Sequence, residues 1–275
     1  SNNSKKYSFP EKCPSCGSKV VKEFNLTTKK YDAVKRCPSE GFKCEKIAIE
    51  KIKHFVSKDA LNIDGLGKKV VEKFWEKKYI RFPQDIFKLN YEKIQNLDGW
   101  GSQSVSNLKF SIDKSRNISL KKFIYSLGIR HIGQENAKLI AKHLQKKENF
   151  LNIDKQYEFN SFVSIDGIGE IQISSIRKFF SLNENLKVIK ELSKHLNIEN
   201  EIINNSGKFK NLSFMITGKL VNMSRAEIKS IIEKNSGKIL SSVNKKLDFL
   251  IIGDKPTTKK VNQANDLGIK IINQE

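Results

Sequence analysis

A short glycine-containing motif recurs four times through the middle of the chain, at residues 65, 99, 131 and 167. The four copies are Asp64-Gly65-Leu66-Gly67, Asp98-Gly99-Trp100-Gly101, His131-Ile132-Gly133 and Asp166-Gly167-Ile168-Gly169. The intervals of 34, 32 and 36 residues indicate an array of similar supersecondary units.

Each motif predicts a tight turn between two short helices. Apolar residues follow it at helical spacing, as at Val70, Val71 and Phe74 after the first copy. Glycine permits positive φ where the chain reverses, and the aspartate that precedes three of the copies is a turn former. We therefore predict four helix-hairpin-helix repeats, in which the apolar residue between the glycines packs between the helices. His131 replaces the first glycine of the third copy, which predicts a variant turn there.

Turns of this kind predict a phosphate-binding surface. Backbone amides that lead into a helix N-terminus form a cradle for anions, and such contacts position a duplex without reading its bases. The candidate DNA-binding residues are Gly65, Gly67, Lys68, Lys69, Gly99, Gly101, Ser102, Arg130, His131, Gly133 and Gln134. The fourth turn is followed by Glu170 in an acidic stretch, so we predict that it binds DNA least. A helical array that only holds protein partners remains the alternative.

The charge of the chain supports a polyanionic partner. Lys and Arg number 51 against 30 Asp and Glu, a net charge of +21, and such a field attracts nucleic acid. Residues 61–150 carry 18 basic and 9 acidic side chains, whereas residues 151–205 carry 6 and 8. No apolar stretch approaches membrane-spanning length and no secretory signal precedes the first motif, so we expect no membrane partner and a cytoplasmic, nucleoid-associated protein.

All four cysteines fall in the first 44 residues, at Cys13, Cys16, Cys37 and Cys44. The spacing C-x2-C, twenty residues, then C-x6-C predicts a four-thiolate Zn2+ site, since a segment this short cannot bury much core without a metal. Two disulfides or unrelated thiols are the alternatives, and the first is rare in the cytosol. The second pair is wide, which predicts an enlarged loop at residues 38–43. His54 lies in an apolar helical pattern, so we interpret it as a helix residue and not as a ligand.

The pattern changes near residue 206 to alternating strands and helices. Strands are predicted at residues 213–217, 238–243, 248–253 and 270–273. The segment Ser224–Glu227 is a capping box that opens a helix, and Asn235-Ser236-Gly237 closes it with a glycine stop. A second helix is predicted at residues 259–267. This order predicts a small parallel sheet covered on both faces, joined to the rest by a polar linker at residues 197–210.

These features predict a multidomain, mainly α chain. We expect a four-cysteine zinc finger at residues 1–46, a helix-hairpin-helix domain of four repeats at residues 47–200, and a small α/β domain with a parallel sheet at residues 201–275.

In that order, the parts resemble the C-terminal half of the bacterial NAD-dependent DNA ligases, whose last domain is a BRCT module. The resemblance rests on CPSCGS, HFVSKDALNIDGLG, FIYSLGIRHIGQENA and FMITGKLVNMSRAEIKSIIEKNSGKI, and it covers essentially the whole chain. It implies a monomeric, DNA-binding portion of an enzyme that seals nicks in duplex DNA during replication and repair. Two departures are the wide second cysteine pair and a BRCT-like module that stops at Glu275, before the last helix of the family.

The resemblance also implies where the chemistry lies. The family attaches AMP to the lysine of a K-x-D-G motif, whereas the D-G steps of this chain read NIDG, NLDG and SIDG. We therefore expect no catalytic residue in this chain, with NAD and Mg2+ bound by an upstream adenylation and OB core and the fragment inactive alone. The alternative function is a non-catalytic DNA-binding scaffold in DNA repair.

Some BRCT modules hold phosphate through a threonine or serine, its glycine and a lysine of the later helix. By resemblance, Thr217, Gly218, Arg225 and Lys260 are candidate ligands for a DNA phosphate, with the Thr217 hydroxyl facing outward at a sheet edge. A cap on the strand beside a solvated basic face is the alternative.

Overall fold

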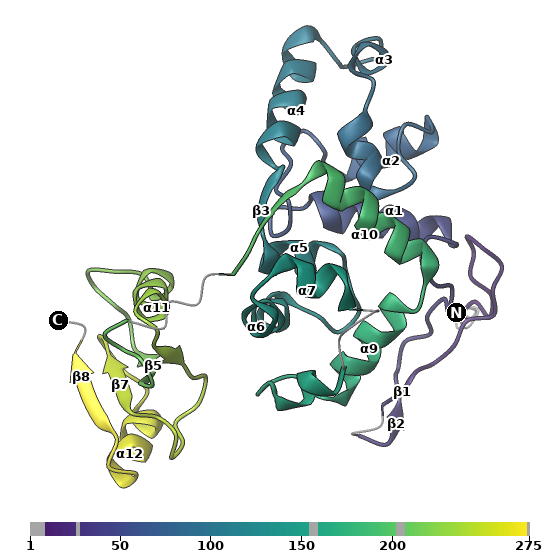
Figure 1. The fold of residues 1–275 in the computed structure, drawn as a ribbon. Helices are drawn as coiled ribbons and strands as arrows, with labels where there is room; N and C mark the ends of the chain where they lie inside the picture. The colour runs from purple at the N-terminus through teal and green to yellow at the C-terminus, as the bar shows by residue number, and fades with distance from the viewer. Residues whose placement is uncertain (1–8, 26–27, 154–158, 202–206, 274–275) are drawn as a thin grey trace, which may run out of the picture. The chain divides into compact units, whose positions relative to one another are not determined.

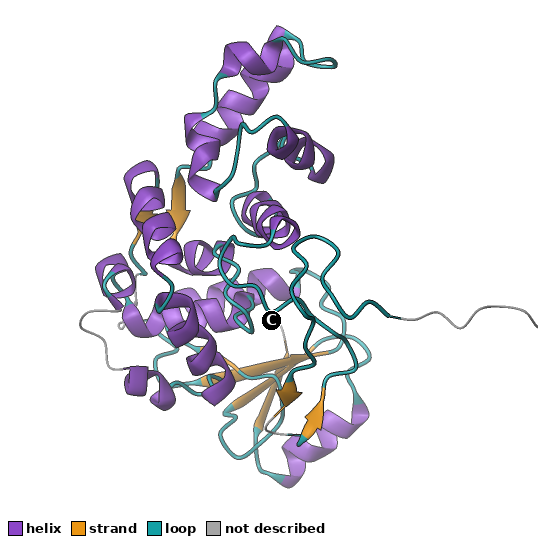
Figure 2. Cartoon of the chain, turned by 90° about the vertical axis from the view of Figure 1, so that its right-hand side faces the viewer, coloured by secondary structure: helices purple, strands orange, loops and turns teal. Residues whose placement is uncertain are grey.

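The computed structural model describes residues 9–25, 28–153, 159–201 and 207–273 (Figure 1). The chain divides into two compact units, Ser1–Glu201 and Ile202–Glu275. The first unit is mainly helical, and the second combines a parallel sheet with helices, as the colouring of Figure 2 shows. No helix in these described ranges combines the length and the apolar character needed to cross a bilayer.

The first unit contains most of the secondary structure. Its helices are α1 (Glu45–Val56), α2 (Lys68–Glu76), α3 (Tyr91–Gln95), α4 (Ser102–Lys114), α5 (Leu120–Ser126), α6 (Gln134–Leu144), α7 (Lys147–Leu151), α9 (Glu170–Phe180) and α10 (Asn183–His195), with 3-10 helices η1 (Pro83–Lys88) and η2 (Phe159–Ser164). Its strands are β1 (Phe24–Asn25), β2 (Lys30–Tyr31), β3 (Asn117–Ser119) and β4 (Asn197–Glu199).

One apolar core joins these helices. It extends from Ala48 in α1 to Ile198 in β4. The helix α1 shows how the sequence builds it: Ala48, Ile52 and Phe55 lie one turn apart, and each is fully buried. The short helices around the glycine turns therefore depend on one another for burial, because none of them is long enough to be stable alone.

The strand β4 corrects the predicted linker. Residues 197–199 pair in parallel with residues 117–119, and Ile198 is 3% exposed. A polar-looking segment thus contributes one buried side chain between two exposed ones, Asn197 and Glu199. The prediction of a linker that starts at residue 197 is wrong for these three residues.

The cysteine segment has little apolar core. In its described part, the buried apolar residues are Cys13 and Cys44. The antiparallel ribbon of β1 and β2 pairs Phe24 with Tyr31, and both rings remain exposed. Apolar burial therefore contributes little to the stability of this segment, as the sequence predicts for a metal-stabilised fold.

The second unit contains β5 (Ser213–Thr217), α11 (Arg225–Lys234), β6 (Lys238–Ile239), β7 (Phe249–Ile252), α12 (Thr258–Asp266) and β8 (Lys270–Asn273). The strand order is β6-β5-β7-β8, and every pair is parallel. Alternate residues of β5 face opposite sides: Phe214 packs with Ile228 of α11, and Met215 packs with Ala264 of α12. The predicted parallel sheet with both faces covered is confirmed.

The ends of α11 show one prediction confirmed and one corrected. The Ser224 hydroxyl accepts from the Glu227 amide over 3.2 Å, and the Glu227 carboxylate accepts from the Ser224 amide over 2.7 Å, so the capping box forms. At the other end Ser236, and not Gly237, has the positive φ of 69°. Gly237 is needed for space instead, because an added Cβ would lie 2.6 Å from Ile232 Cγ2.

Candidate metal centre and nucleic-acid interface

The structure brings all four cysteines together. Their sulfur atoms lie within 4.8 Å of one another, with 3.4 Å between the Sγ atoms of Cys16 and Cys37 and 3.9 Å between those of Cys13 and Cys44. Tetrahedral zinc with Zn–S bonds of ~2.3 Å places its sulfurs ~3.8 Å apart, whereas a disulfide requires ~2.05 Å. All four are free thiols here. The donor set and its spacing therefore fit a metal ion.

Hydroxyl groups around the cluster favour a thiolate. The Oγ atoms of Ser18 and Ser39 each lie 3.3 Å from Cys16 Sγ. Hydrogen bonding with the Ser18 hydroxyl, the Ser39 hydroxyl and the Ser18 backbone lowers the pKa of Cys16 from 9.0 to about 5. Thiolate is the form that binds metal, so the surroundings of this sulfur prepare it as a ligand.

The first cysteine pair sits in a tight knuckle. The Gly17 amide donates to the Cys13 carbonyl over 2.8 Å, and Gly17 has a φ of 73°. At the other end of the segment, Cys44 is the residue on which α1 begins. The fourth ligand of the candidate metal site thus stands directly at the start of the first core helix.

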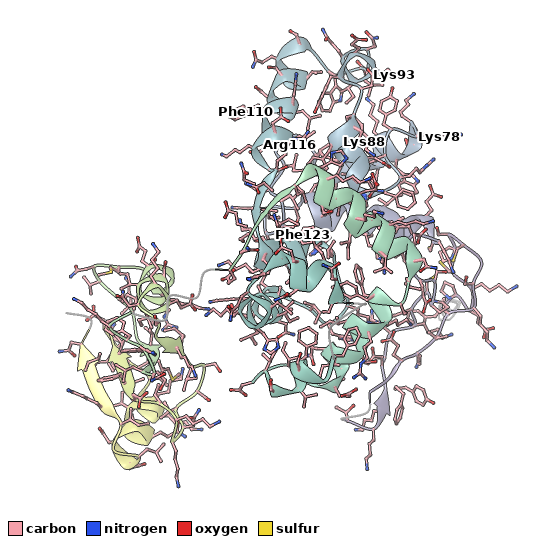
Figure 3. All side chains as sticks on the ribbon, in the orientation of Figure 1. Lys78, Lys88, Lys93, Phe110, Arg116 and Phe123 are labelled. Carbon is pink, nitrogen blue, oxygen red and sulfur yellow. The ribbon has the colours of Figure 1, made fainter. Side chains whose placement is uncertain are left out.

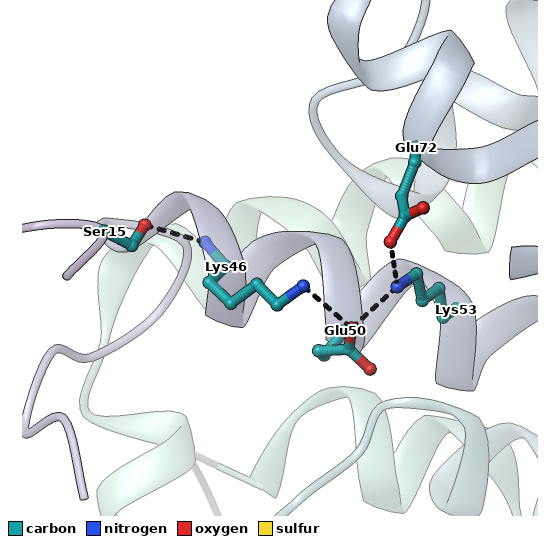
Figure 4. A network of polar contacts seen from close by, with 5 residues as sticks. All are labelled: Ser15, Lys46, Glu50, Lys53 and Glu72. Atoms are coloured by element: carbon teal, nitrogen blue, oxygen red, sulfur yellow. Dashed lines mark hydrogen bonds and ion pairs between the residues drawn. The ribbon is translucent and has the colours of Figure 1, made fainter. Parts of the chain in front are cut away.

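A polar network continues from the knuckle along α1 (Figure 4). The Ser15 hydroxyl accepts from the Lys46 amide over 3.3 Å, which fastens the knuckle to the first turn of the helix. Two turns further on, Lys53 Nζ lies 2.7 Å from both Glu50 and Glu72. Glu72 belongs to α2, so the network connects the cysteine segment with the helix that follows the first glycine turn.

His54 contributes to packing, as predicted. Its Nε2 lies 2.8 Å from the carbonyl oxygen of Tyr125, and the two rings meet edge to face. It links α1 with α5 and is not among the residues that could hold the metal.

All four glycine motifs adopt one backbone geometry. The amide of the apolar middle residue donates to the carbonyl three residues before it, over 3.3 Å at Leu66, 3.0 Å at Trp100, 3.1 Å at Ile132 and 3.0 Å at Ile168. The last glycine of each motif caps the following helix: Gly67 for α2, Gly101 for α4, Gly133 for α6 and Gly169 for α9. Each turn therefore presents helix N-terminal amides, as the sequence predicts.

The third turn is not a structural variant. His131 takes a φ of 60°, close to the values of 90°, 82° and 92° at Gly65, Gly99 and Gly167. A hydrogen bond from Asn136 Nδ2 to the His131 carbonyl, 3.0 Å long, braces the turn that follows. The left-handed conformation is thus kept without a glycine, and the prediction of a different turn is wrong.

The candidate residues at the first three turns lie at the surface. Gly67, Lys68 and Lys69 are exposed at the start of α2, Gly101 and Ser102 at the start of α4, and Arg130, His131, Gly133 and Gln134 around the start of α6. The fourth turn differs, since the Gly169 amide donates to Gln172 Oε1 over 3.1 Å. A ligand at this turn would have to displace an internal acceptor.

The turns are packed in pairs, which sequence reasoning missed. The Asp64 amide of the first turn donates to the Ser111 hydroxyl of α4 over 2.7 Å, and Lys73 Nζ of α2 donates to the Asp98 carbonyl of the second turn over 3.0 Å. The rings of Phe74 and Trp100 lie 5.6 Å apart between them. The first two turns are therefore held at a fixed spacing by reciprocal contacts.

The third and fourth turns make a similar pair, because a Cβ added at Gly167 would lie 3.1 Å from Leu139 Cδ1 of α6. No local sequence signal indicates these contacts, because each one joins residues more than twenty positions apart.

The basic side chains labelled in Figure 3 differ in their surroundings. Lys78, Lys88 and Lys93 lie exposed on the helical surface. Arg116 turns inward instead: its guanidinium lies 5.1 Å from the Phe87 ring centroid, and Nη1 donates to the His195 carbonyl over 3.2 Å. Lys78, Lys88 and Lys93 therefore face solvent, with Lys88 Nζ 3.4 Å from Glu191 Oε2, whereas Arg116 is half-buried.

The structure brings together most of the four residues of the candidate BRCT-like site. Arg225 Nη2 donates to the Gly218 carbonyl over 3.0 Å. The Thr257 amide donates to Thr217 Oγ1 over 3.3 Å, which brings the start of α12, and with it Lys260, to the end of β5. However, β5 is an internal strand and Thr217 is 1% exposed. The expected outward-facing hydroxyl at a sheet edge is therefore wrong.

Two family models match the chain. The model of the BRCA1 C Terminus (BRCT) domain matches residues 204–275, which contain the parallel sheet. The helix-hairpin-helix motif matches residues 122–189, which contain the third and fourth turns.

Curated relatives match almost the whole chain. A protein named DNA ligase from Pelagibacter ubique is 65% identical over 99% of the chain and 40% of its own length. Proteins of the same name from Neorickettsia sennetsu and Wolbachia pipientis are 36% and 40% identical, each over 99% of the chain and 41% of its own length. The chain thus spans about 40% of the length of these relatives. It is therefore related, over nearly its entire length, to a C-terminal part of the DNA ligases, and it contains a helix-hairpin-helix segment and a BRCT domain.

Proposed function

We propose that this chain is the DNA-binding C-terminal portion of an NAD-dependent DNA ligase that seals nicks in duplex DNA during replication and repair. The observation that carries the proposal is the set of helix N-termini at Gly67, Gly101 and Gly133, exposed in a strongly basic segment of a DNA-ligase relative. Three such cradles suit a polyanion with evenly spaced phosphates, and they read no base edges. The partner is therefore duplex DNA without sequence preference.

The paired arrangement supports a clamping role. The contacts Asp64–Ser111 and Lys73–Asp98 hold the first two turns at a fixed spacing, so both can engage phosphates of one duplex without rearrangement. Such preorganisation places the DNA for a reaction centre elsewhere in the protein. NAD and Mg2+ supply the adenylation chemistry there, and residues of this chain bind and orient the duplex.

We also propose that the cysteine cluster is a structural zinc site formed by Cys13, Cys16, Cys37 and Cys44. Four thiols with no open coordination position favour a structural ion over a catalytic one. In this proposal the zinc finger spans residues 1–46, the four hairpins span residues 47–200, and the BRCT domain spans residues 201–275. One copy of the chain binds one duplex.

The BRCT domain contributes a phosphate site in this proposal. Gly218, Arg225 and Lys260 are its ligands. Thr217 accepts a hydrogen bond from the Thr257 amide and so positions the start of α12, the helix that carries Lys260. The burial of Thr217 supports a positioning role, whereas Arg225 is exposed and would exchange its bond to the Gly218 carbonyl for a phosphate.

Fluorescence anisotropy with a labelled duplex tests the DNA proposal. We expect duplexes of unrelated sequence to bind equally, with log affinity falling by about 0.9 per phosphate contact for each tenfold rise in salt. A salt-independent affinity, or binding of protein partners without DNA, would instead support the helical scaffold.

Adenylation separates a ligase portion from a complete ligase. Incubated with NAD or ATP and Mg2+, the chain should form no AMP adduct on any lysine, because no lysine stands two residues before the Asp of its D-G steps. A stable adduct detected by mass spectrometry would overturn the assignment of catalysis to another part of the protein.

A further inference from the structure

Arg130, at the third turn, already has an anionic partner. Its Nη1 donates to Glu23 Oε1, and Glu23 belongs to the cysteine segment directly before β1. Both side chains are partly exposed, at 43% and 38%. The contact joins residues 107 positions apart in the sequence, so the fold, and not local structure, places a carboxylate on this guanidinium.

Both partners are held in position by further bonds. The Glu23 carbonyl accepts from the Asp32 amide over 2.7 Å, which fixes Glu23 in the ribbon. Arg130 Nε donates to His131 Nε2 over 3.1 Å, so the ring of the turn residue orients the guanidinium. Arg130 therefore lies at the third turn with part of its guanidinium already bonded to Glu23 of the same chain.

The energetics allow this carboxylate to be replaced. An ion pair between exposed side chains contributes little to stability and is screened by salt. A phosphate offers arginine two charge-assisted hydrogen bonds in a planar fork, which is a stronger arrangement. A duplex at the third turn also brings further phosphates, and these repel Glu23.

We propose that Glu23 is an internal competitor for the phosphate that Arg130 binds, so that the finger and DNA exchange places on one guanidinium. The inference rests on the proposed DNA binding. In the free protein the carboxylate neutralises Arg130 and ties the ribbon to the third turn. In the complex the phosphate replaces it, and the ribbon loses this tie.

A second ion pair provides the matched control. Glu40 of the cysteine segment lies 2.9 Å from Lys178 Nζ, and Lys178 is in the last turn of α9. This pair also joins the cysteine segment to the helical part of the first unit, through side chains that are 38% (Glu40) and 66% (Lys178) exposed, but it lies at the end of α9 opposite the fourth turn. Glu23→Gln and Glu40→Gln therefore remove the same charge from the same segment, and only the first one frees a turn residue.

The experiment compares the affinities of these variants for a short fluorescent duplex at several salt concentrations. We expect Glu23→Gln to bind about two- to five-fold more tightly than the unaltered protein at low salt, with a smaller gain at high salt. Glu40→Gln should change the affinity less. In an Arg130→Gln background the effect of Glu23→Gln should disappear.

Three results would overturn the exchange. Weaker binding by Glu23→Gln would indicate that Glu23 instead orients Arg130 toward the DNA. Equal gains for Glu23→Gln and Glu40→Gln would reduce the effect to overall charge, and a gain that persists with Arg130→Gln would exclude this guanidinium. Failure of the unaltered protein to bind duplex at any salt would reject the proposed function as well, which distinguishes the two failures.

Discussion

The amide of Gly169 donates to the side chain of Gln172 over 3.1 Å, so the fourth glycine turn supplies its own acceptor. Its backbone otherwise matches the turns at Gly67 and Gly101, which have the same position at the start of a helix. The four turns therefore share one backbone geometry, but we do not expect them to bind anions equally well. The difference lies in one side chain three residues further along.

This relationship predicts a ranking of the turns. Gly101 has extended backbone with φ of −101°, and nothing lies within 4 Å of an added Cβ. Gly101→Leu should therefore fold normally yet cover the cradle, and it should lower duplex affinity about tenfold through loss of a charged hydrogen bond of ~1.5 kcal/mol. The measurement is anisotropy at fixed salt, with the thermal midpoint as a check of folding.

The comparison for this ranking is Gly169→Leu at the corresponding position of the fourth turn, where an added Cβ would lie 3.3 Å from Gln172 Oε1. It should change the affinity by less than twofold, a roughly 0.4 kcal/mol effect, because Gln172 already occupies the amide. Equal losses at Gly101 and Gly169 would contradict the ranking.

Metal removal should unfold the cysteine segment. Cys44 is both a candidate ligand and the residue on which α1 begins, so Cys44→Ser should abolish binding of one Zn2+ and fray that helix. Elemental analysis and hydrogen exchange of residues 45–56 would measure the two effects. Ser15→Ala is the control, because Ser15 contacts the Lys46 amide and no sulfur, so the metal should remain. An intact Cys13–Cys44 disulfide without metal would contradict the site.

The ion pair between α1 and α2 predicts a pH-dependent stability. The Lys53 ammonium donates to Glu72 and lowers the pKa of Glu72 below its ordinary 4.5. A lowered pKa in the folded state stabilises the fold above pH 4.5, and this contribution is lost as the pH falls through the folded value. Glu72→Gln should lower the thermal midpoint by a few degrees at neutral pH, since it leaves the 9%-exposed Lys53 with Glu50 alone.

The same variant should differ less from the unaltered protein at a pH well below the lowered folded-state pKa of Glu72, where this side chain is protonated in both the folded and the unfolded state. Glu76→Gln, an exposed change in the same helix, serves as the control and should leave the midpoint unchanged at either pH. A deficit of Glu72→Gln that is equal at both pH values would show that packing, and not charge, is responsible.

The BRCT site predicts a preference for phosphorylated DNA ends. Arg225→Ala combined with Lys260→Ala should weaken binding to a 5′-phosphorylated end about tenfold, the equivalent of one charge-assisted hydrogen bond of ~1.5 kcal/mol. Binding to a 5′-hydroxyl end should change little. Lys259→Ala removes one positive charge beside Lys260 in α12 and should not discriminate between the ends. If the affinity for DNA ends does not depend on the 5′-phosphate, the domain would serve in packing and not in phosphate binding.

The sequence alone determined the local structures. Positive φ at Gly65 and the capping box at Ser224 depend on residues within four positions of each other, and spacing reports such dependence directly. The clustering of four thiols was also predictable, because zinc requires a fixed number of ligands within a short segment. His131 shows the limit of this reasoning, since a neighbouring Asn136 supports a conformation that its side chain alone disfavours.

Only the tertiary structure decided which distant groups meet. The pairing of residues 117–119 with 197–199, the burial of Thr217 in an internal strand and the contact of Glu23 with Arg130 all join segments 25 or more residues apart. Such contacts depend on which faces the core buries together and on the side chains left at its rim. A spacing rule describes one segment at a time. It therefore predicted where the glycine turns would form, and it did not predict which turn residues already bond to other groups of the protein.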